Sequence, residues 1–169
     1  MTIKTETIDP YPRKYSAAVS LERRDRRDPR ELLPERSLEE VRGWLLRDAV
    51  REGDLMVLFA ELCRRLTGAG LPVTRVSLHI RTLHPQVAGF GWFWRSDDGI
   101  TDEIKVDRAV LLSDVYRLNP LFRVLEHGEL LDLRPMEAAV QERFAIMKEL
   151  AEEGITHYIA APMGSGERY

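Results

Sequence analysis

The sequence predicts an α+β fold in which a small antiparallel sheet is flanked by helices. Residues 75–81 and 90–95 alternate apolar and polar side chains with the period of two that is typical of a half-buried strand. Upstream of them, apolar residues between 37 and 66 recur at the spacing of amphipathic helices. The chain has 169 residues, 44% hydrophobic and 31% charged, so it can form one domain with appendages but not two ordinary domains.

Residues 1–36 differ in composition from the rest of the chain. They contain several prolines and, over 21–28, a run of interleaved arginine and acidic residues with little apolar content. Such a segment cannot bury enough surface to offset the conformational entropy that is lost on ordering. We therefore predict a mobile charged leader over 1–36, whose arginines are solvated or contact a phosphate or an acidic partner, and a folded domain over 37–169.

Two consecutive helices are predicted before the first strand. Ser37 and Glu40 have the spacing of a capping box, in which each side chain accepts a hydrogen bond from a free amide at the start of the helix. Gly53-Asp54 then offers a break or a second cap. The second apolar stripe, 55–66, ends before a cluster of glycine and proline residues that stops the helix.

The helix pair carries more apolar surface than one small sheet covers. We predict that the surplus makes a homodimer contact through Trp44, Leu45, Leu55 and Phe59; the alternative is a longer helix pair packed within one subunit. Cys63 lies beside this stripe, where a buried inert thiol is far commoner than a nucleophile. As the single cysteine, it also excludes an internal disulfide and a multi-cysteine metal site, which fits a reducing cytosol.

The two alternating stretches are predicted to pair as an antiparallel hairpin. Pro85 lacks an amide for the ladder and Gly89 tolerates turn geometry, so residues 84–89 are expected to connect the strands. One face of the hairpin is then apolar and aromatic, and consists of Val76, Leu78, Ile80, Phe90, Trp92 and Trp94.

The opposite face of the hairpin is the candidate ligand site, with Arg75, His79, Arg81, Phe93 and Arg95 as candidate ligand-binding residues. Strand rise separates Arg75 from Arg81 by roughly 20 Å, so these two cannot hold one small ligand. Arg81 and Arg95 are expected to be neighbours that need either a salt bridge to a carboxylate from elsewhere in the chain or a small anionic effector beside His79. The plainer alternative is a face that only meets solvent.

The second half of the chain is predicted to add two strands and one clear helix. Between them, Ser113-Asp114 is expected to cap a short helix, Asn119-Pro120 to interrupt before 121–125 resumes, and 130–133 to form a brief extended piece. Residues 100–106 and 156–163 have strand patterns, and apolar spacing predicts one helix over 136–153, stopped by Gly154 in a left-handed conformation. Gly164–Tyr169 has the form of a hairpin turn, which needs a second strand to pair with. We therefore expect the domain to lack its last strand or strands and the chain to be part of something longer.

Several function classes are not supported by the sequence. It has no glycine-rich phosphate loop, no nucleophile elbow and no His-x-x-x-His helix, and it points to no cofactor or metal. A net charge of -3 argues against a nucleic-acid surface. No apolar run approaches the roughly 18 residues of a membrane span, and no signal peptide is evident, so a cytoplasmic location without membrane contact is expected.

Specific motifs carry a family resemblance. They are Leu-Cys-Arg-Arg-Leu at 62–66, Gly-Leu-Pro at 70–72, Arg-Val-Ser-Leu-His at 75–79, Arg-Thr-Leu-His-Pro at 81–85, an aromatic run ending in Trp94-Arg95, and Glu-Gly-Ile-Thr-His-Tyr-Ile-Ala-Ala-Pro at 153–162. Over residues 44–163 the chain resembles the N-terminal region of bacterial class III adenylate/guanylate cyclases, with His157 departing from an acid that is common there. In that family the region is a GAF-like or PAS-like sensor placed before the catalytic domain.

The resemblance implies a regulatory input domain, with an unknown small-molecule effector, that controls a downstream cyclase catalytic domain in the parent polypeptide. The metal-binding aspartates and the transition-state asparagine and arginine of class III catalysis have no counterparts here, so this chain is not expected to be an enzyme. Two alternatives stay open: a ligand-free dimerisation module, and a stand-alone GAF-like domain that binds a small molecule. Whether the parent makes cyclic AMP or cyclic GMP also stays open.

Overall fold

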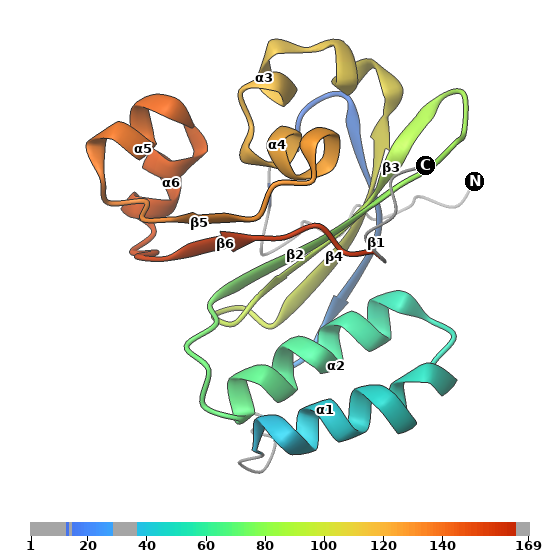
Figure 1. The fold of residues 1–169 in the computed structure, drawn as a ribbon. Helices are drawn as coiled ribbons and strands as arrows, with labels where there is room; N and C mark the ends of the chain where they lie inside the picture. The colour runs from blue at the N-terminus through green and yellow to red at the C-terminus, as the bar shows by residue number, and fades with distance from the viewer. Residues whose placement is uncertain (1–12, 14, 29–36, 165–169) are drawn as a thin grey trace, which may run out of the picture.

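A computed structural model describes residues 13, 15–28 and 37–164, and it confirms the α+β class (Figure 1). A four-stranded antiparallel sheet has the order β1-β4-β3-β2, and β5 and β6 form a separate two-stranded sheet. The sheet strands are β1 (Val19–Arg26), β2 (Arg75–Arg81), β3 (Val87–Arg95), β4 (Ile100–Asp107), β5 (Leu131–Leu133) and β6 (Tyr158–Ala160). The helices are α1 (Leu38–Arg47), α2 (Leu55–Gly68), α3 (Asp114–Arg117), α4 (Pro120–His127), α5 (Ala138–Arg143) and α6 (Ile146–Glu152), with 3-10 turns η1 (Ala49–Arg51) and η2 (Arg108–Leu112).

The large sheet separates two helical layers. The antiparallel pair α1 and α2 covers one face, at the bottom of Figure 1, and α3 to α6 lie on the other side with the small sheet. The predicted capping box is confirmed: the Ser37 hydroxyl accepts from the Glu40 amide, and the Glu40 carboxylate accepts from the Ser37 amide. Asp54 caps α2 by accepting from the amides of Met56 and Val57.

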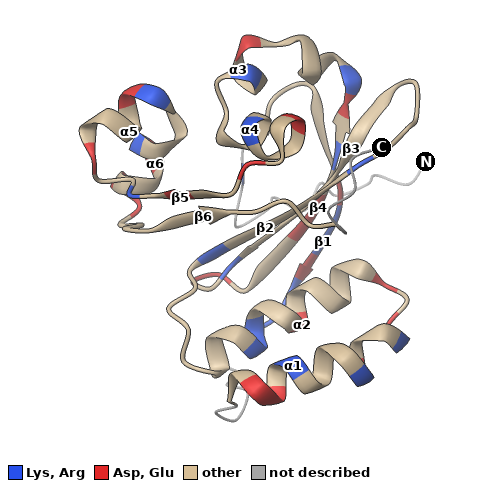
Figure 2. Cartoon of the chain, in the orientation of Figure 1, with Lys and Arg blue, Asp and Glu red and all other residues tan. Residues whose placement is uncertain are grey.

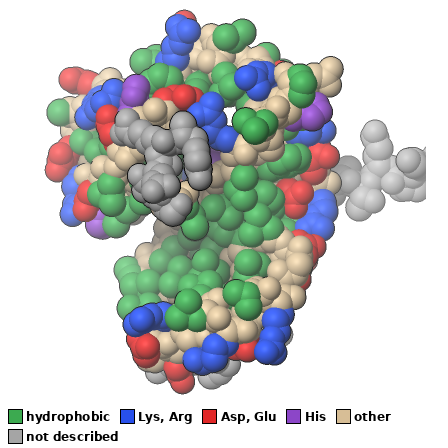
Figure 3. Space-filling model, turned by 45° about the vertical axis from the view of Figure 1, so that its right-hand side comes forward, with side chains coloured by type: hydrophobic (Ala, Val, Ile, Leu, Met, Phe, Trp, Pro, Cys, Tyr) green, Lys and Arg blue, Asp and Glu red, His purple; other side chains and the backbone are tan. Residues whose placement is uncertain are grey.

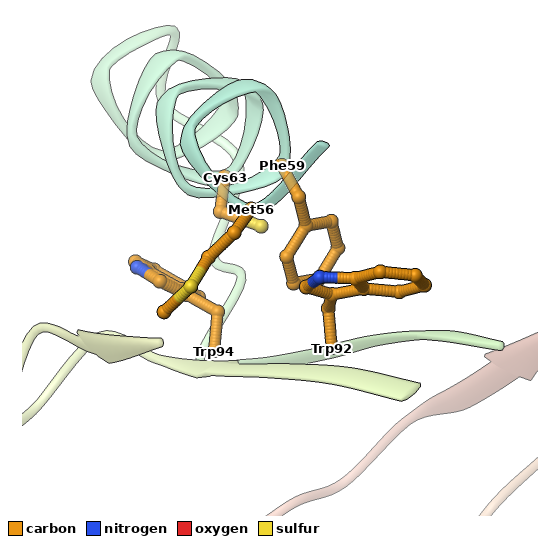
Figure 4. Packing of buried hydrophobic residues seen from close by; sticks show 5 residues of the cluster. All are labelled: Met56, Phe59, Cys63, Trp92 and Trp94. Carbon is orange, nitrogen blue, oxygen red and sulfur yellow. The ribbon is translucent and has the colours of Figure 1, made fainter. Parts of the chain in front are cut away.

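The main core lies between α2 and β3. Met56, Phe59 and Cys63 point from α2 toward Trp92 and Trp94 of the sheet, as Figure 4 shows. All five are less than a tenth exposed, and Cys63 is 0% exposed. Burial raises the pKa of the Cys63 thiol to about 12, so the expected inert, buried cysteine is confirmed.

The predicted hairpin is confirmed, but residues 82–86 connect its strands instead of the expected 84–89. β2 pairs with β3 in a register that places Leu78 opposite Trp92 and Ser77 opposite Phe93. The register of β3 against β4 shifts between Val87 and Gly89. Gly89 is required there, because a Cβ atom would lie 2.3 Å from the carbonyl oxygen of Ile80.

The predicted leader over 1–36 is wrong for part of its length, because Val19–Arg26 forms β1, an edge strand paired with β4. Its side chains are stabilised by opposite charges on neighbouring elements rather than by apolar burial, and basic and acidic residues are interspersed along the strand (Figure 2). The guanidinium of Arg23, for example, donates to both carboxylate oxygens of Asp54 at 2.7 and 2.9 Å. Composition alone could not reveal partners that lie so far away in the sequence.

The single helix predicted over 136–153 is also wrong, because the chain forms two short helices, α5 and α6. Phe144 leaves the helical conformation, with φ -136° and ψ 102°, and its ring is 4% exposed in a second core cluster with Met147 and Leu150. Packing of the ring outweighs continuation of the helix at this point. Gly154 has φ 81°, which confirms the expected left-handed stop.

The surface of the molecule is hollowed beside the helix pair. Figure 3 shows hydrophobic side chains gathered in this hollow, between the helices at the bottom and the rest of the chain above.

The predicted strand over 156–163 is shorter than expected, and the turn predicted at Gly164–Tyr169 lies almost wholly outside the described residues. Among the helices of the described ranges, none is both long and apolar enough to cross a bilayer.

Candidate functional site

The candidate site lies on the face of the large sheet opposite α2. Val76 and Leu78 of β2 pack against the core cluster on the α2 side, so the alternation of the strand turns Ser77 and His79 to the other face. Phe93 of β3 lies opposite Ser77 and therefore shares this face. The structure thus brings two of the predicted ligand-binding residues, His79 and Phe93, together.

His79 packs edge-on against Phe93. Their ring centroids are 5.3 Å apart and their planes are inclined by 83°. Gly91 makes the space for this pair, because a Cβ atom there would lie 3.0 Å from Phe93 Cε2 and 3.4 Å from His79 Nδ1. The ring of His79 keeps some exposed surface, but its Nε2 atom is buried and has no hydrogen-bond partner among the described residues.

The imidazole of His79 is neutral at physiological pH. Burial lowers its pKa from 6.5 to about 4, because the charged form loses its hydration and no carboxylate of the described ranges compensates for that loss. A neutral imidazole does not attract an anion, but it can donate or accept one hydrogen bond at Nε2, depending on its tautomer. The unpartnered nitrogen is therefore a hydrogen-bonding group that the rest of the described chain does not use.

The three arginines of the predicted site are paired with carboxylates. Arg75 and Arg95 share Glu153, at 3.2 and 3.0 Å, and Arg81 pairs with Glu126 at 3.1 Å. The expectation that Arg81 and Arg95 are neighbours is wrong, because Arg95 lies opposite Arg75 in the register and Arg81 lies opposite Gly89. Of the two alternatives, the salt bridge is the one observed.

A small polar cleft of about 190 Å³ lies at the Arg75 end of this face. It is lined by Thr74, Arg75, Arg95, Asp97, Glu153 and Ile155. Two basic and two acidic side chains balance in charge, and the volume is below the 300–1,000 Å³ or so that is usual for ligand sites. The cleft therefore offers no net charge that would select an ion.

A buried carboxylate that the sequence analysis missed lies farther along the same face. Asp102 of β4 is 0% exposed, and its oxygens accept hydrogen bonds from Arg24 Nε at 2.5 Å, Arg24 Nη2 at 2.9 Å and the Tyr15 hydroxyl at 2.6 Å. Burial opposes ionisation, but the hydrogen bonds from Arg24 and Tyr15 and the charges of Arg13 and Arg24 outweigh it and lower the pKa of Asp102. Burial and the same hydrogen bond raise the pKa of Tyr15.

The position of Asp102 in the sequence could have indicated that this carboxylate is buried. Asp102 stands in the middle of a strand that was predicted over 100–106, and an acid on the covered face of a strand needs a cationic partner. The cationic partners are Arg13 and Arg24, which lie in the segment 1–36 that composition predicts to be a leader. Tyr15 also contacts Phe93, with ring centroids 6.3 Å apart, so Phe93 lies between Tyr15 and His79.

The predicted dimer residues divide between core and surface. Phe59 is 4% exposed in the main core and is therefore not a surface contact, whereas Leu55 packs against that core and is only partly buried. Trp44 is half-buried beneath the guanidinium of Arg65, which lies 4.4 Å from the ring centroid. Leu45 is 38% exposed and stays available for a contact.

No group of three metal-ligating side chains occurs within the described ranges. Comparison of the chain with protein-family models, with characterised proteins and with solved structures finds no match.

Proposed function

We propose that this chain is a GAF/PAS-like regulatory sensor domain of a class III adenylate or guanylate cyclase, which binds a small molecule beside His79 and controls an attached catalytic domain. One observation carries the ligand site: the buried, unpartnered Nε2 atom of His79. Leaving such an atom without a partner costs about 1–3 kcal/mol. Buried polar atoms in native proteins nearly always bond to protein, water or a ligand, so an atom without a protein partner marks a candidate binding position.

The electrostatics of the face indicate the class of ligand. Arg75, Arg81 and Arg95 are already paired with glutamates, and His79 is neutral, so an anionic effector has no free cation among these residues to bind. Phe93 adds an aromatic surface next to the imidazole. We therefore expect a small uncharged ligand with an apolar body and one hydrogen-bonding group.

The cyclase connection is supported by the motifs over residues 44–163, and the antiparallel sheet between two helical layers is compatible with a small sensor domain. The chain itself has no counterpart of the class III catalytic residues. We expect no cyclic product from ATP or GTP in the presence of Mg²⁺ or Mn²⁺. Product above a control without protein contradicts this part of the proposal.

A thermal-shift screen tests the sensor function. The full chain is heated with each member of a panel of uncharged metabolites, because a compound that binds only the folded state raises its melting temperature. A compound that stabilises the wild type but not His79→Leu supports the site. Fusion of the chain to a class III catalytic domain then tests control, through the change in cyclic nucleotide formed when that compound is added. Absence of any His79-dependent shift contradicts the proposal.

The second candidate function is a ligand-free homodimerisation module. Apolar side chains exposed on α1 and η1 favour it, namely Leu38 at 51%, Leu45 at 38%, Leu46 at 68% and Val50 at 74%. In this case light scattering at tens of micromolar gives the mass of a dimer, and Trp44→Glu lowers it to that of a monomer. A monomeric wild type rejects this candidate.

A further inference from the structure

The guanidinium of Arg13 is held by four groups from two neighbouring strands and the turn between them. Its Nη2 atom donates to both oxygens of Asp98, at 2.7 and 2.8 Å, and to the carbonyl of Ile100 at 3.3 Å. Its Nη1 atom donates to Asp102 at 3.3 Å and to the carbonyl of Phe93 at 3.5 Å. Every one of these partners is an acceptor.

The Nη1 and Nη2 donors of a planar guanidinium fit this arrangement better than an ammonium does, while the Nε atom of Arg13 is buried without a hydrogen-bond partner among the described residues. A guanidinium presents several N–H groups in one rigid fork, whereas an ammonium is a compact point charge with three donors. The site is also sheltered, because the side chains of Arg13, Asp98 and Asp102 are 14%, 18% and 0% exposed. Shelter from water strengthens each of these charge-assisted contacts.

We propose that Asp98, Asp102 and the carbonyls of Phe93 and Ile100 form a guanidinium-binding site, which Arg13 occupies from within the chain and a small guanidinium compound occupies when Arg13 is absent. The charge balance favours a cation there. Among the described residues that these contacts join, two carboxylates face two arginines, Arg13 and Arg24, and removal of Arg13 leaves that group with an excess negative charge. The proposal does not depend on the sensor function.

In the wild type, Arg13 competes with any external ligand. An intramolecular ligand on a short connection acts at an effective concentration in the millimolar range. Arg13 is also part of the same short segment as Tyr15, which donates to Asp102 and contacts Phe93. Release of Arg13 therefore weakens the hold of this segment on the face that carries His79.

Chemical rescue tests the site with methylguanidinium as the probe and methylammonium, at the same ionic strength, as the comparison. We expect Arg13→Ala to melt several degrees below the wild type. At about 10 mM, methylguanidinium should raise the melting temperature of Arg13→Ala by about 2–4 °C, the shift that a stabilisation near 1 kcal/mol gives in a domain of this size. The wild type should move by less than half as much, and methylammonium should rescue neither protein.

Two further variants show that the rescue is local. Arg13→Ala/Asp98→Asn should not respond to methylguanidinium, because the double hydrogen bond to the carboxylate is lost. The asparagine side chain still has an oxygen that can accept from the Ile100 amide, as Asp98 does in the wild type, so the turn is kept. Arg27→Ala is the matched control, since Arg27 pairs with Asp25 at 3.2 Å and its side chain is 34% exposed. It should show no rescue.

The proposal is overturned if Arg13→Ala has the same melting temperature as the wild type. It is also overturned if methylguanidinium and methylammonium raise the melting temperature of Arg13→Ala equally. It is also overturned if the double variant is rescued as well as Arg13→Ala. Should Arg13→Ala not fold by itself, circular dichroism after refolding with 10 mM methylguanidinium decides the matter. Recovery of the folded spectrum supports the site, and failure to recover contradicts it.

Discussion

The buried imidazole of His79 predicts a stability that falls between pH 7.5 and pH 5. The pKa is about 4 in the folded chain, against 6.5 for an ordinary histidine, so the unfolded chain binds the proton more readily. The contribution of His79 is therefore complete above pH 6.5 and is lost as the pH falls toward 4. Its cause is burial, and no charged partner of the imidazole within the described ranges contributes.

Linkage gives the size of the effect. A difference of about 2.5 pKa units corresponds to up to about 3 kcal/mol, and about 2 kcal/mol of it is lost between pH 7.5 and pH 5. Asp54 and Asp102 have lowered pKa values, so their ionised forms stabilise the folded chain. This stabilisation is lost only near pH 4 and below, where aspartates of the unfolded chain take up protons. Because the chain has three other histidines, one of which pairs with Asp132, the comparison with His79→Leu, rather than the pH window alone, assigns the decline to His79.

Urea unfolding at pH 7.5, 6.5, 5.5 and 5.0 measures this dependence in the wild type and in His79→Leu. The variant should lose the decline of about 2 kcal/mol, and at pH 7.5 it should be as stable as the wild type or more so, because it no longer buries an unpartnered nitrogen. His84→Ala is the control, since His84 is exposed in the hairpin connection, and it should keep the wild-type slope. Parallel slopes for wild type and His79→Leu refute the reasoning.

Three further outcomes follow from the packing. Asp102→Asn should destabilise the fold by about 3 kcal/mol in urea unfolding, because it removes the buried carboxylate that accepts from Arg24, Arg13 and Tyr15. Glu39→Gln, in an exposed pair with Arg42, should change little. Gly89→Ala should cost about 1–3 kcal/mol, because its Cβ atom meets the carbonyl oxygen of Ile80 at 2.3 Å. A cost no larger than that of Gly53→Ala, whose Cβ meets nothing within 4 Å, counts against this close approach of β2 to β3. Phe59→Ala should lower the free energy of unfolding by about 3–5 kcal/mol and leave the oligomeric mass unchanged. Leu46→Ala is the neutral comparison, because Leu46 is 68% exposed. A changed mass for Phe59→Ala would show that Phe59 belongs to a dimer contact after all.

The elements that the sequence predicted well are those specified by local chemistry. The capping box at Ser37, the stop at Gly154 and the alternation of the hairpin each depend on residues a few positions apart. The elements it missed depend on distant partners. β1 pairs with a strand about 80 residues later in the chain, and the break at Phe144 follows from a ring that is drawn into the second core.

The candidate site was likewise predictable only in the features that local sequence decides. Alternation alone placed His79 and Phe93 on one face, and the structure brings them into contact. The register, which sequence alternation does not fix, decided that Arg95 meets Arg75 rather than Arg81. The orphan nitrogen of His79 could not be foreseen, because the lack of a partner is a property of everything that surrounds the ring.

Phe93 connects the two halves of this face. One side of its ring meets His79 and another meets Tyr15, which is tied through Asp102 to the site that holds Arg13. Tyr15 keeps its own hydrogen bond to Asp102 at 2.6 Å, so we expect the loss of Arg13 to loosen the contact between Tyr15 and Phe93 rather than to remove it. If both proposed sites are occupied, we expect them to be coupled in free energy through Phe93, whose carbonyl belongs to the guanidinium site and whose ring contacts His79. Each ligand should then alter the affinity for the other by the same factor.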